Sequence, residues 1–176
     1  MRVFTQAIPP LAILLRDDGI IPNNPTLPLL LFRRAIDLSG TPDPENVVED
    51  VFGRNGWGDM WRNGIYPFVH YHSMIHEALG IARGRAKVRF GGALGREIEV
   101  EAGDVAVLPA GTGHQRLWQS PDLTVIGAYP PSGTYNLCEG TPAEYARAHA
   151  AIGQVLLPEA DPVFGPDGPL MRLWQG

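Results

Sequence analysis

The sequence has a single cysteine, fewer basic than acidic residues, and no long apolar run. Because Cys138 is the one thiol among 176 residues, no disulfide can form within the chain. The 14 Lys and Arg residues are outnumbered by 19 Asp and Glu, and the net charge of -5 argues against binding to nucleic-acid phosphates. Pro9 and Pro10 interrupt the N-terminal apolar stretch, and no segment approaches the roughly 20 apolar residues of a membrane span. We therefore expect a cytoplasmic protein that binds neither nucleic acid nor membrane.

Glycine and proline, by contrast, are abundant and spread along the whole chain. The 21 Gly and 17 Pro residues suit many short elements joined by turns. A length of 176 residues allows one domain with a substantial core but not two of ordinary size. We expect a single domain over residues 1–176, with a barrel core at about 60–130, an N-terminal extension at 1–59, and a C-terminal helix and tail at 131–176.

Two segments carry the signals of short helices outside this core. Residues 43–53 begin with Asp43 as N-cap and Pro44 at the first helical position, and they end in a glycine. Residues 141–153 open with a capping box formed by Thr141 and Glu144. We expect these two helices to flank a sheet.

Between the two helices, short apolar runs alternate with turn residues. The expected strands are 66–72, 77–82, 86–90, 97–101, 105–108, 114–118 and 123–129, and segments 3–8 and 29–35 are expected to add edge strands. Many short strands with frequent turns indicate an all-β fold, and we predict a double-sheet jelly roll.

Two histidines one residue apart give the clearest chemical signal. Residues i and i+2 of a strand project from the same face, so His70 and His72 can present two imidazoles to one point. A third imidazole, His114, follows a Pro/Gly turn, and Glu77 lies five residues after His72. Imidazole and carboxylate together suit a first-row divalent ion rather than a structural zinc site made of thiolates. The sequence therefore predicts an accessible site for one Fe, Mn, Ni or Zn ion.

The pattern resembles the two motifs of the cupin family. The spacing Gly64-x5-His70-x-His72-x4-Glu77-x6-Gly84 fits the first motif throughout. The spacing Gly103-x5-Pro109-x-Gly111-x2-His114 fits the second up to its last position, where the family has Asn and this chain has Trp118. The resemblance implies a double-stranded β-helix, or cupin barrel, whose metal ligands are His70, His72, Glu77 and His114.

A narrower resemblance, to the YjlB-type single-domain cupins, spans nearly the whole chain. It rests on segments 17–24, 61–64, 70–73, 76–80, 89–92 and 161–169. Because many cupins pair through edge strands, we also expect a homodimer.

His76 is the ambiguous residue of the site, because a shift of one position along the strand would exchange it with Glu77. The spacing from Glu77 to the turn at Gly84 favours Glu77 as the ligand. His76 is then expected either to contact a metal ligand from outside the coordination sphere or to lie at the surface.

Strand alternation also predicts a substrate pocket beside the metal. Tyr66 and Phe68 should share the inward face of His70, and Arg116 and Trp118 that of His114. Arg116 is expected either at the pocket mouth, where its guanidinium would bind an anion, or in an ion pair at the surface. Trp57, Trp61 and Tyr129 enlarge the aromatic set, and we expect about two of the six aromatic residues to line a ligand cavity.

Three functions are compatible with this pattern. The leading hypothesis is a metal-dependent enzyme on a small organic substrate, with dioxygenase-like or isomerase-like chemistry and Glu77 as the catalytic acid or base. The second is a cupin that binds a metal and a small ligand without turnover. The third, a structural protein with merely packed histidines, is the weakest because two imidazoles on one face gain little from burial unless something ligates them.

Overall fold

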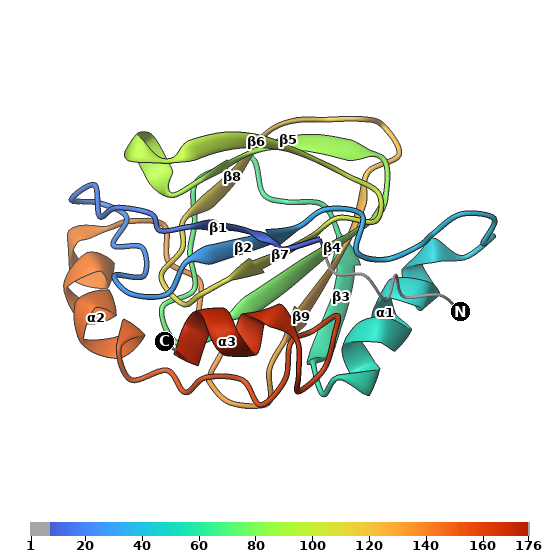
Figure 1. Cartoon of the computed structure of the whole chain (residues 1–176). Coiled ribbons are helices and arrows are strands. Elements are labelled where there is room, and N and C mark those ends of the chain that lie inside the picture. Colours follow the sequence, from blue (N-terminus) through green and yellow to red (C-terminus); the bar gives the residue numbers. More distant parts are fainter. Residues whose placement is uncertain (1–7, 176) are drawn as a thin grey trace.

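The computed structural model describes residues 8–175, whose strands form two antiparallel sheets (Figure 1). The larger sheet has six strands in the order β1-β2-β7-β4-β9-β3. They are β1 (Leu11–Ile13), β2 (Leu29–Phe32), β3 (Gly58–Asn63), β4 (Glu77–Arg83), β7 (Val105–Leu108) and β9 (Thr124–Tyr129). The smaller sheet runs β6 (Arg96–Glu101), β5 (Arg85–Phe90), β8 (His114–Gln119), and the short 3-10 helix η1 (Gly92–Leu94) joins β5 to β6. This arrangement is the jelly roll expected from the sequence.

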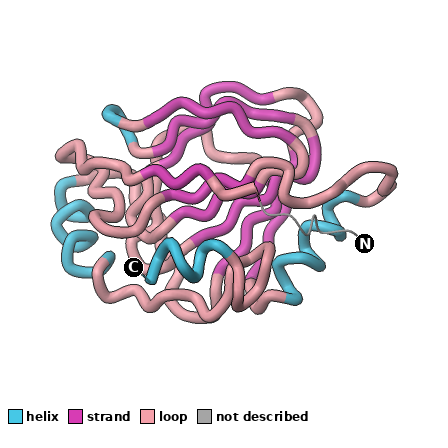
Figure 2. The backbone as a smooth tube through the Cα atoms, viewed as in Figure 1, coloured by secondary structure: helices cyan, strands magenta, loops and turns pink. Residues whose placement is uncertain are grey.

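A hydrophobic core fills the space between the sheets, which Figure 2 shows as separate layers. Leu79 and Ile81 of β4 belong to this core, together with Val88 and Phe90 of β5. Ala78, whose side chain lies on the opposite face of β4, belongs instead to the cluster on the outer side of the larger sheet. Because side chains alternate along a strand, the first residue of β4, Glu77, shares the inward side of Leu79.

The outer side of the larger sheet is covered by α1 (Pro44–Arg54) and α3 (Pro169–Gln175) (Figure 1). As predicted, α1 begins after Asp43, whose side chain accepts a hydrogen bond from the Asn46 N–H at 3.2 Å. The helix packs closely because β4 has a glycine beneath it. A Cβ at Gly80 would lie 2.5 Å from Val48 Cγ1 and 2.9 Å from Phe52 Cζ.

The second expected helix is observed as α2 (Pro142–Ile152), with the predicted capping box between Thr141 and Glu144. It lies at the opposite end of the molecule from α1 (Figure 1). Its Ile152 packs into a small third cluster with Tyr71 and Cys138. Within residues 8–175, none of the helices has the length and apolar character needed to cross a bilayer.

Six of the expected strands are observed to within one residue at each end, but segments 66–72 and 29–35 require correction. Residues 66–72 form no continuous strand: His70 and Tyr71 make isolated bridges, to His114 and Cys138 respectively. The segment changes partner after a single residue, so no ladder develops. Residues 29–32 form β2, which pairs with β1 on one side and β7 on the other and is therefore not an edge strand. The strand expected at 3–8 lies, apart from its last residue, outside the described residues.

Candidate metal centre

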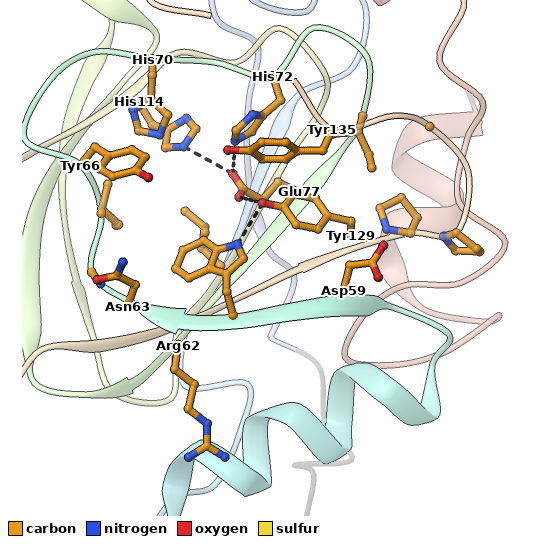
Figure 3. Close-up of a pocket in the computed structure, with 18 residues that line it drawn as sticks. Asp59, Arg62, Asn63, Tyr66, His70, His72, Glu77, His114, Tyr129 and Tyr135 are labelled. Atoms are coloured by element: carbon orange, nitrogen blue, oxygen red, sulfur yellow. Dashed lines mark hydrogen bonds and ion pairs between the residues drawn. The ribbon is translucent and has the colours of Figure 1, made fainter. Parts of the chain in front are cut away.

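Three buried histidines meet at one end of the space between the sheets. His70 and His72 lie on the segment that leads into β4, and His114 is the first residue of β8. Two backbone hydrogen bonds join the two parts: His70 N donates to His114 O at 3.1 Å, and His114 N donates to His70 O at 2.9 Å. One ring nitrogen from each histidine lies within 4.8 Å of the others. The predicted convergence of the three imidazoles is therefore present (Figure 3).

Glu77, at the start of β4, lies beside two of these histidines. Its Oε2 lies 3.4 Å from the Nε2 atoms of both His72 and His114. The carboxylate is almost fully buried, with 2% of the residue exposed, and its Oε2 has no hydrogen-bond partner within the protein. A buried carboxylate oxygen without a partner is costly unless a cation or proton lies beside it.

The backbone fixes the tautomer of all three histidines. His70 Nδ1 lies 3.1 Å from Phe68 O, His114 Nδ1 lies 3.1 Å from Thr112 O, and His72 Nδ1 contacts Asn136 O. A carbonyl oxygen only accepts, so each Nδ1 carries the proton and donates. In the neutral imidazoles the lone pair is then on Nε2, the atom that ligates a metal when Nδ1 is held in this way.

The electrostatics of the group also suit a cation. Burial, together with the neighbouring His114, lowers the pKa of His70 to about 3. Burial alone would lower the pKa of His72 and raise that of Glu77, but their attraction reverses both, raising the pKa of His72 and holding that of Glu77 far below its usual range. The carboxylate of Glu77 thus favours its charged form despite burial, and a divalent ion at this point would satisfy its Oε2.

A tyrosine and a tryptophan hold the other oxygen of Glu77. Tyr129, the last residue of β9, donates its hydroxyl to Glu77 Oε1 at 3.1 Å. Trp61 of β3 donates its indole N–H to that hydroxyl at 2.9 Å. Both bonds are drawn in Figure 3. The expected aromatic set contained both residues, but the hydrogen bonds depend on strand order, in which β9 lies between β4 and β3.

A cavity of about 540 Å³ opens onto these groups. Its walls include Trp61, Tyr66, Ile75, Leu79, Tyr129 and Tyr135. Tyr66 therefore lines the cavity as predicted. Phe68 does not line it but stacks on the Tyr66 ring, with centroids 4.8 Å apart.

Arg116 and Trp118, the other two predicted pocket residues, lie outside the cavity. Arg116 donates its Nε to Ile65 O at 3.0 Å, because the segment before His70 runs along β8 and separates it from the cavity. Trp118 is half-exposed on the outer face, where the Arg85 guanidinium carbon lies 5.5 Å from its ring centroid. The register of β5 and β8 shifts just before Trp118, and this shift turns its side chain outward.

His76 faces away from the centre, as expected if Glu77 faces inward. Of the two positions predicted for it, in contact with a metal ligand or at the surface, the surface position is wrong. It is fully buried, and burial lowers its pKa to about 4. Its Nδ1 accepts a hydrogen bond from Ala110 N at 2.9 Å, and its ring packs 4.9 Å from that of Trp174 in α3. His76 thus anchors the turn before β8 to the outer helix layer rather than touching the other three histidines.

The loop after β9 supplies two residues that were not predicted. Tyr135 places its ring 5.0 Å from that of His72, and the Oδ1 of Asn136 accepts a hydrogen bond from Ser73 N at 3.0 Å. Nothing in the sequence around positions 135–136 signals these contacts, because they depend on where the loop returns across the segment 70–74.

Comparisons with known proteins agree with the sequence motifs. No protein-family model matches the chain. The chain is 40% identical over 158 residues to the protein YjlB of Bacillus subtilis strain 168, a match that covers 90% of this chain and 92% of YjlB.

Similar solved structures include two enzymes. One is an acireductone dioxygenase from Bacillus anthracis with a cadmium ion in its active centre, which is 16% identical, with a TM-score of 0.42 and coverage of 57% of this chain and 76% of that one. The other is an oxalate decarboxylase of Lactobacillus farciminis, which is 18% identical, with a TM-score of 0.34 and coverage of 74% and 34%. Both TM-scores are low, so neither structure indicates the chemistry of this chain.

Proposed function

Because the chain belongs to the YjlB family of cupins, we propose that it is a metal-dependent enzyme that acts on a small organic substrate. The observation that carries this proposal is the preset geometry of the centre. Each of the three histidines has its Nδ1 held by a carbonyl, and Glu77 has a buried oxygen without a partner beside them. A packed core would gain nothing from this arrangement, whereas a metal site needs it.

The proposed ligands are His70, His72, His114 and Glu77 for one divalent Fe, Mn, Ni or Zn ion. Four protein ligands leave one or two positions free in a five- or six-coordinate ion. A metal bound there would supply Lewis acidity toward a substrate oxygen and, in the case of Fe or Mn, redox chemistry, which would support isomerase-like or dioxygenase-like reactions.

The protein's own residues would position the substrate and move its protons. Trp61, Ile75 and Leu79 give the cavity apolar walls that exclude water. Tyr129 tethers one oxygen of Glu77 and leaves the other directed at the centre. With Oε2 on the metal, Oε1 is the oxygen of Glu77 that keeps a second lone pair beside its bond from Tyr129. We assign to this oxygen the role of proton acceptor from a substrate hydroxyl or an activated C–H group. A homodimer and a cytoplasmic location stay predictions, which light scattering and cell fractionation would test.

A comparison of two histidine substitutions tests the proposal. His72→Ala removes a proposed ligand, whereas His149→Ala removes a histidine that pairs with Asp17 at the surface, away from the cavity. Metal content is measured by elemental analysis of protein purified without added metal. We expect His72→Ala to lose most of the metal and His149→Ala to retain it.

Turnover of small organic substrates is then screened aerobically, with protein that has been reconstituted with Fe²⁺, Mn²⁺, Ni²⁺ or Zn²⁺. An enzyme should lose metal and turnover together in His72→Ala. A wild type that holds the metal and binds ligands yet converts no substrate would support the non-catalytic binding protein instead. Equal metal content in both variants and the wild type would disprove the assigned ligands.

A further inference from the structure

We propose that the substrate is an electrically neutral molecule with a flat apolar body and a hydroxyl or carbonyl oxygen, and that the cavity discriminates against carboxylates. This inference rests on the proposed function for the metal, and it takes the class of substrate from the charges and surfaces of the cavity walls.

Apart from the proposed metal, the part of the cavity lining that the structure describes offers an anionic substrate no free cationic side chain. Among the residues described, Arg62 is the one Lys or Arg side chain in its lining. Its guanidinium is already engaged: Nε and Nη2 donate to the carboxylate of Glu49 at 2.6 and 2.8 Å, and Nη2 also donates to Asn46 Oδ1 at 2.6 Å. Both partners are on α1, and Figure 3 shows Arg62 directed toward that helix and away from the histidines. Carboxylate substrates are commonly held by an arginine fork, which is not available here.

Arg116 does not supply the missing charge. It lines a separate cleft that shares only the segment 62–66 with the cavity, and its Nε is bound to Ile65 O. The segment therefore lies between this guanidinium and the histidines.

The lining carries negative charge instead. Glu77 lies beside the histidines, and Asp59 is an exposed residue of the lining. With a divalent ion bound, the two carboxylates and the ion sum to zero formal charge. An anionic substrate would then add an unbalanced charge in a partly desolvated cavity, whereas a neutral one would not.

Neutral hydrogen-bonding groups and aromatic faces complete the lining. Tyr66 and Tyr135 line the cavity, and their phenol hydroxyls can both donate to and accept from uncharged oxygen groups. The hydroxyl of Tyr129, which also lines it, already donates to Glu77. The half-exposed Tyr66 ring, backed by its stack with Phe68, and the half-exposed Tyr135 ring beside His72 offer flat apolar surfaces. Such surfaces suit a planar body.

Two probes of matched shape test the inference: 4-hydroxybenzamide, which is neutral, and 4-hydroxybenzoate, which is an anion at pH 7. Their binding to zinc-loaded protein is measured by calorimetry. We expect the amide to bind at least about tenfold more tightly than the carboxylate. Equal or tighter binding of the carboxylate would overturn the inference, as would a lack of binding of both probes.

Two variants that each remove one negative charge test whether Asp59 causes the preference for the neutral probe. Asp59→Asn should narrow the preference for the amide several-fold. Asparagine tolerates the positive φ of 49° at this position, so the backbone is kept. Glu99→Gln removes the same charge from an exposed residue of β6 outside the cavity and should leave the preference unchanged. Identical behaviour of the two variants would contradict the role of Asp59.

Metal binding is measured separately on the same samples. A protein that binds none of Zn²⁺, Fe²⁺, Mn²⁺ and Ni²⁺ refutes the proposed function, and the preference between the probes in that metal-free protein still decides the inference, because the cavity then carries even less positive charge.

Discussion

The hydroxyl of Tyr129 is the contact whose loss should weaken metal binding most without removing a ligand. It donates to Glu77 Oε1 at 3.1 Å and accepts from Trp61 Nε1 at 2.9 Å. Burial and the nearby Glu77 raise the pKa of Tyr129, so the hydroxyl stays protonated and remains a donor. Tyr129→Phe deletes this one oxygen and keeps the ring.

The expected magnitude follows from the burial of Glu77. In Tyr129→Phe its Oε1 has lost its donor inside a residue that is 2% exposed. Leaving a buried acceptor unpaired costs about 1–3 kcal/mol, and deleting an outer partner of a ligand typically weakens metal affinity about 10- to 100-fold. Trp61→Phe should have a smaller effect, because the indole only orients the hydroxyl.

The assay is competition for Zn²⁺ between the protein and a fluorescent chelator, at constant pH. Tyr135→Phe is the matched control, since its ring lines the same cavity but its hydroxyl does not bond Glu77. We expect Tyr129→Phe to raise the Kd by about 10- to 100-fold and Tyr135→Phe to leave it within a factor of about two. A Kd for Tyr129→Phe that equals the control's, in protein whose circular dichroism matches wild type, would refute the reasoning.

Three further predictions concern metal removal, pH and packing. A chelator should lower the melting temperature of metal-loaded protein without unfolding it, by an amount that corresponds to about 2.7 kcal/mol if free metal stood at 100 times its Kd; no change in a sample shown to contain metal would contradict tight binding. Because Glu77 raises the pKa of His72 despite burial, a proton competes with the metal there, so the apparent affinity for the metal should weaken as pH drops through that raised pKa; an apparent Kd, measured with a dye, that stays constant across the histidine range would disprove this. Gly80→Ala should destabilise the fold by about 1–3 kcal/mol in urea unfolding, because the new methyl group overlaps α1, whereas Gly153→Ala, with open space around its Cβ, should be nearly neutral; equal midpoints for the two variants would show that α1 shifts freely.

The sequence was sufficient to predict the bounds of elements that begin or end at cap or turn residues. Strand β7 ends before Pro109, and α1 begins at the predicted cap and proline. It was insufficient for β3, because Gly58–Asn63 is polar and has no clear alternation, and its strand character comes from pairing with β9. Its place in the sheet is nevertheless what brings Trp61 to Tyr129.

The sequence motifs brought the four proposed ligands to attention, although the local structure of two of them was mispredicted. The segment around His70 and His72 is held by single bridges on either side rather than by a ladder, yet both histidines still face the centre. Two histidines at this spacing can therefore face the same point even where the backbone forms no regular strand. Tyr135 and Asn136 had no comparable spacing to reveal them, because their contacts depend on the path of a loop.

The positions of His114 and Trp118 show how far the alternation of side-chain faces can be assumed along a strand. In β8, His114 pairs with Phe90 and Arg116 with Val88, so alternation holds over these positions. The next pair is Trp118 with Lys87, where unbroken register would have set Trp118 opposite Ala86, a core residue. One extra residue in β8 therefore moves Trp118 to the outer face, beside Arg85. Because His114 precedes this bulge, its orientation follows from the motif, whereas every inference about a side chain beyond Arg116 required the observed register.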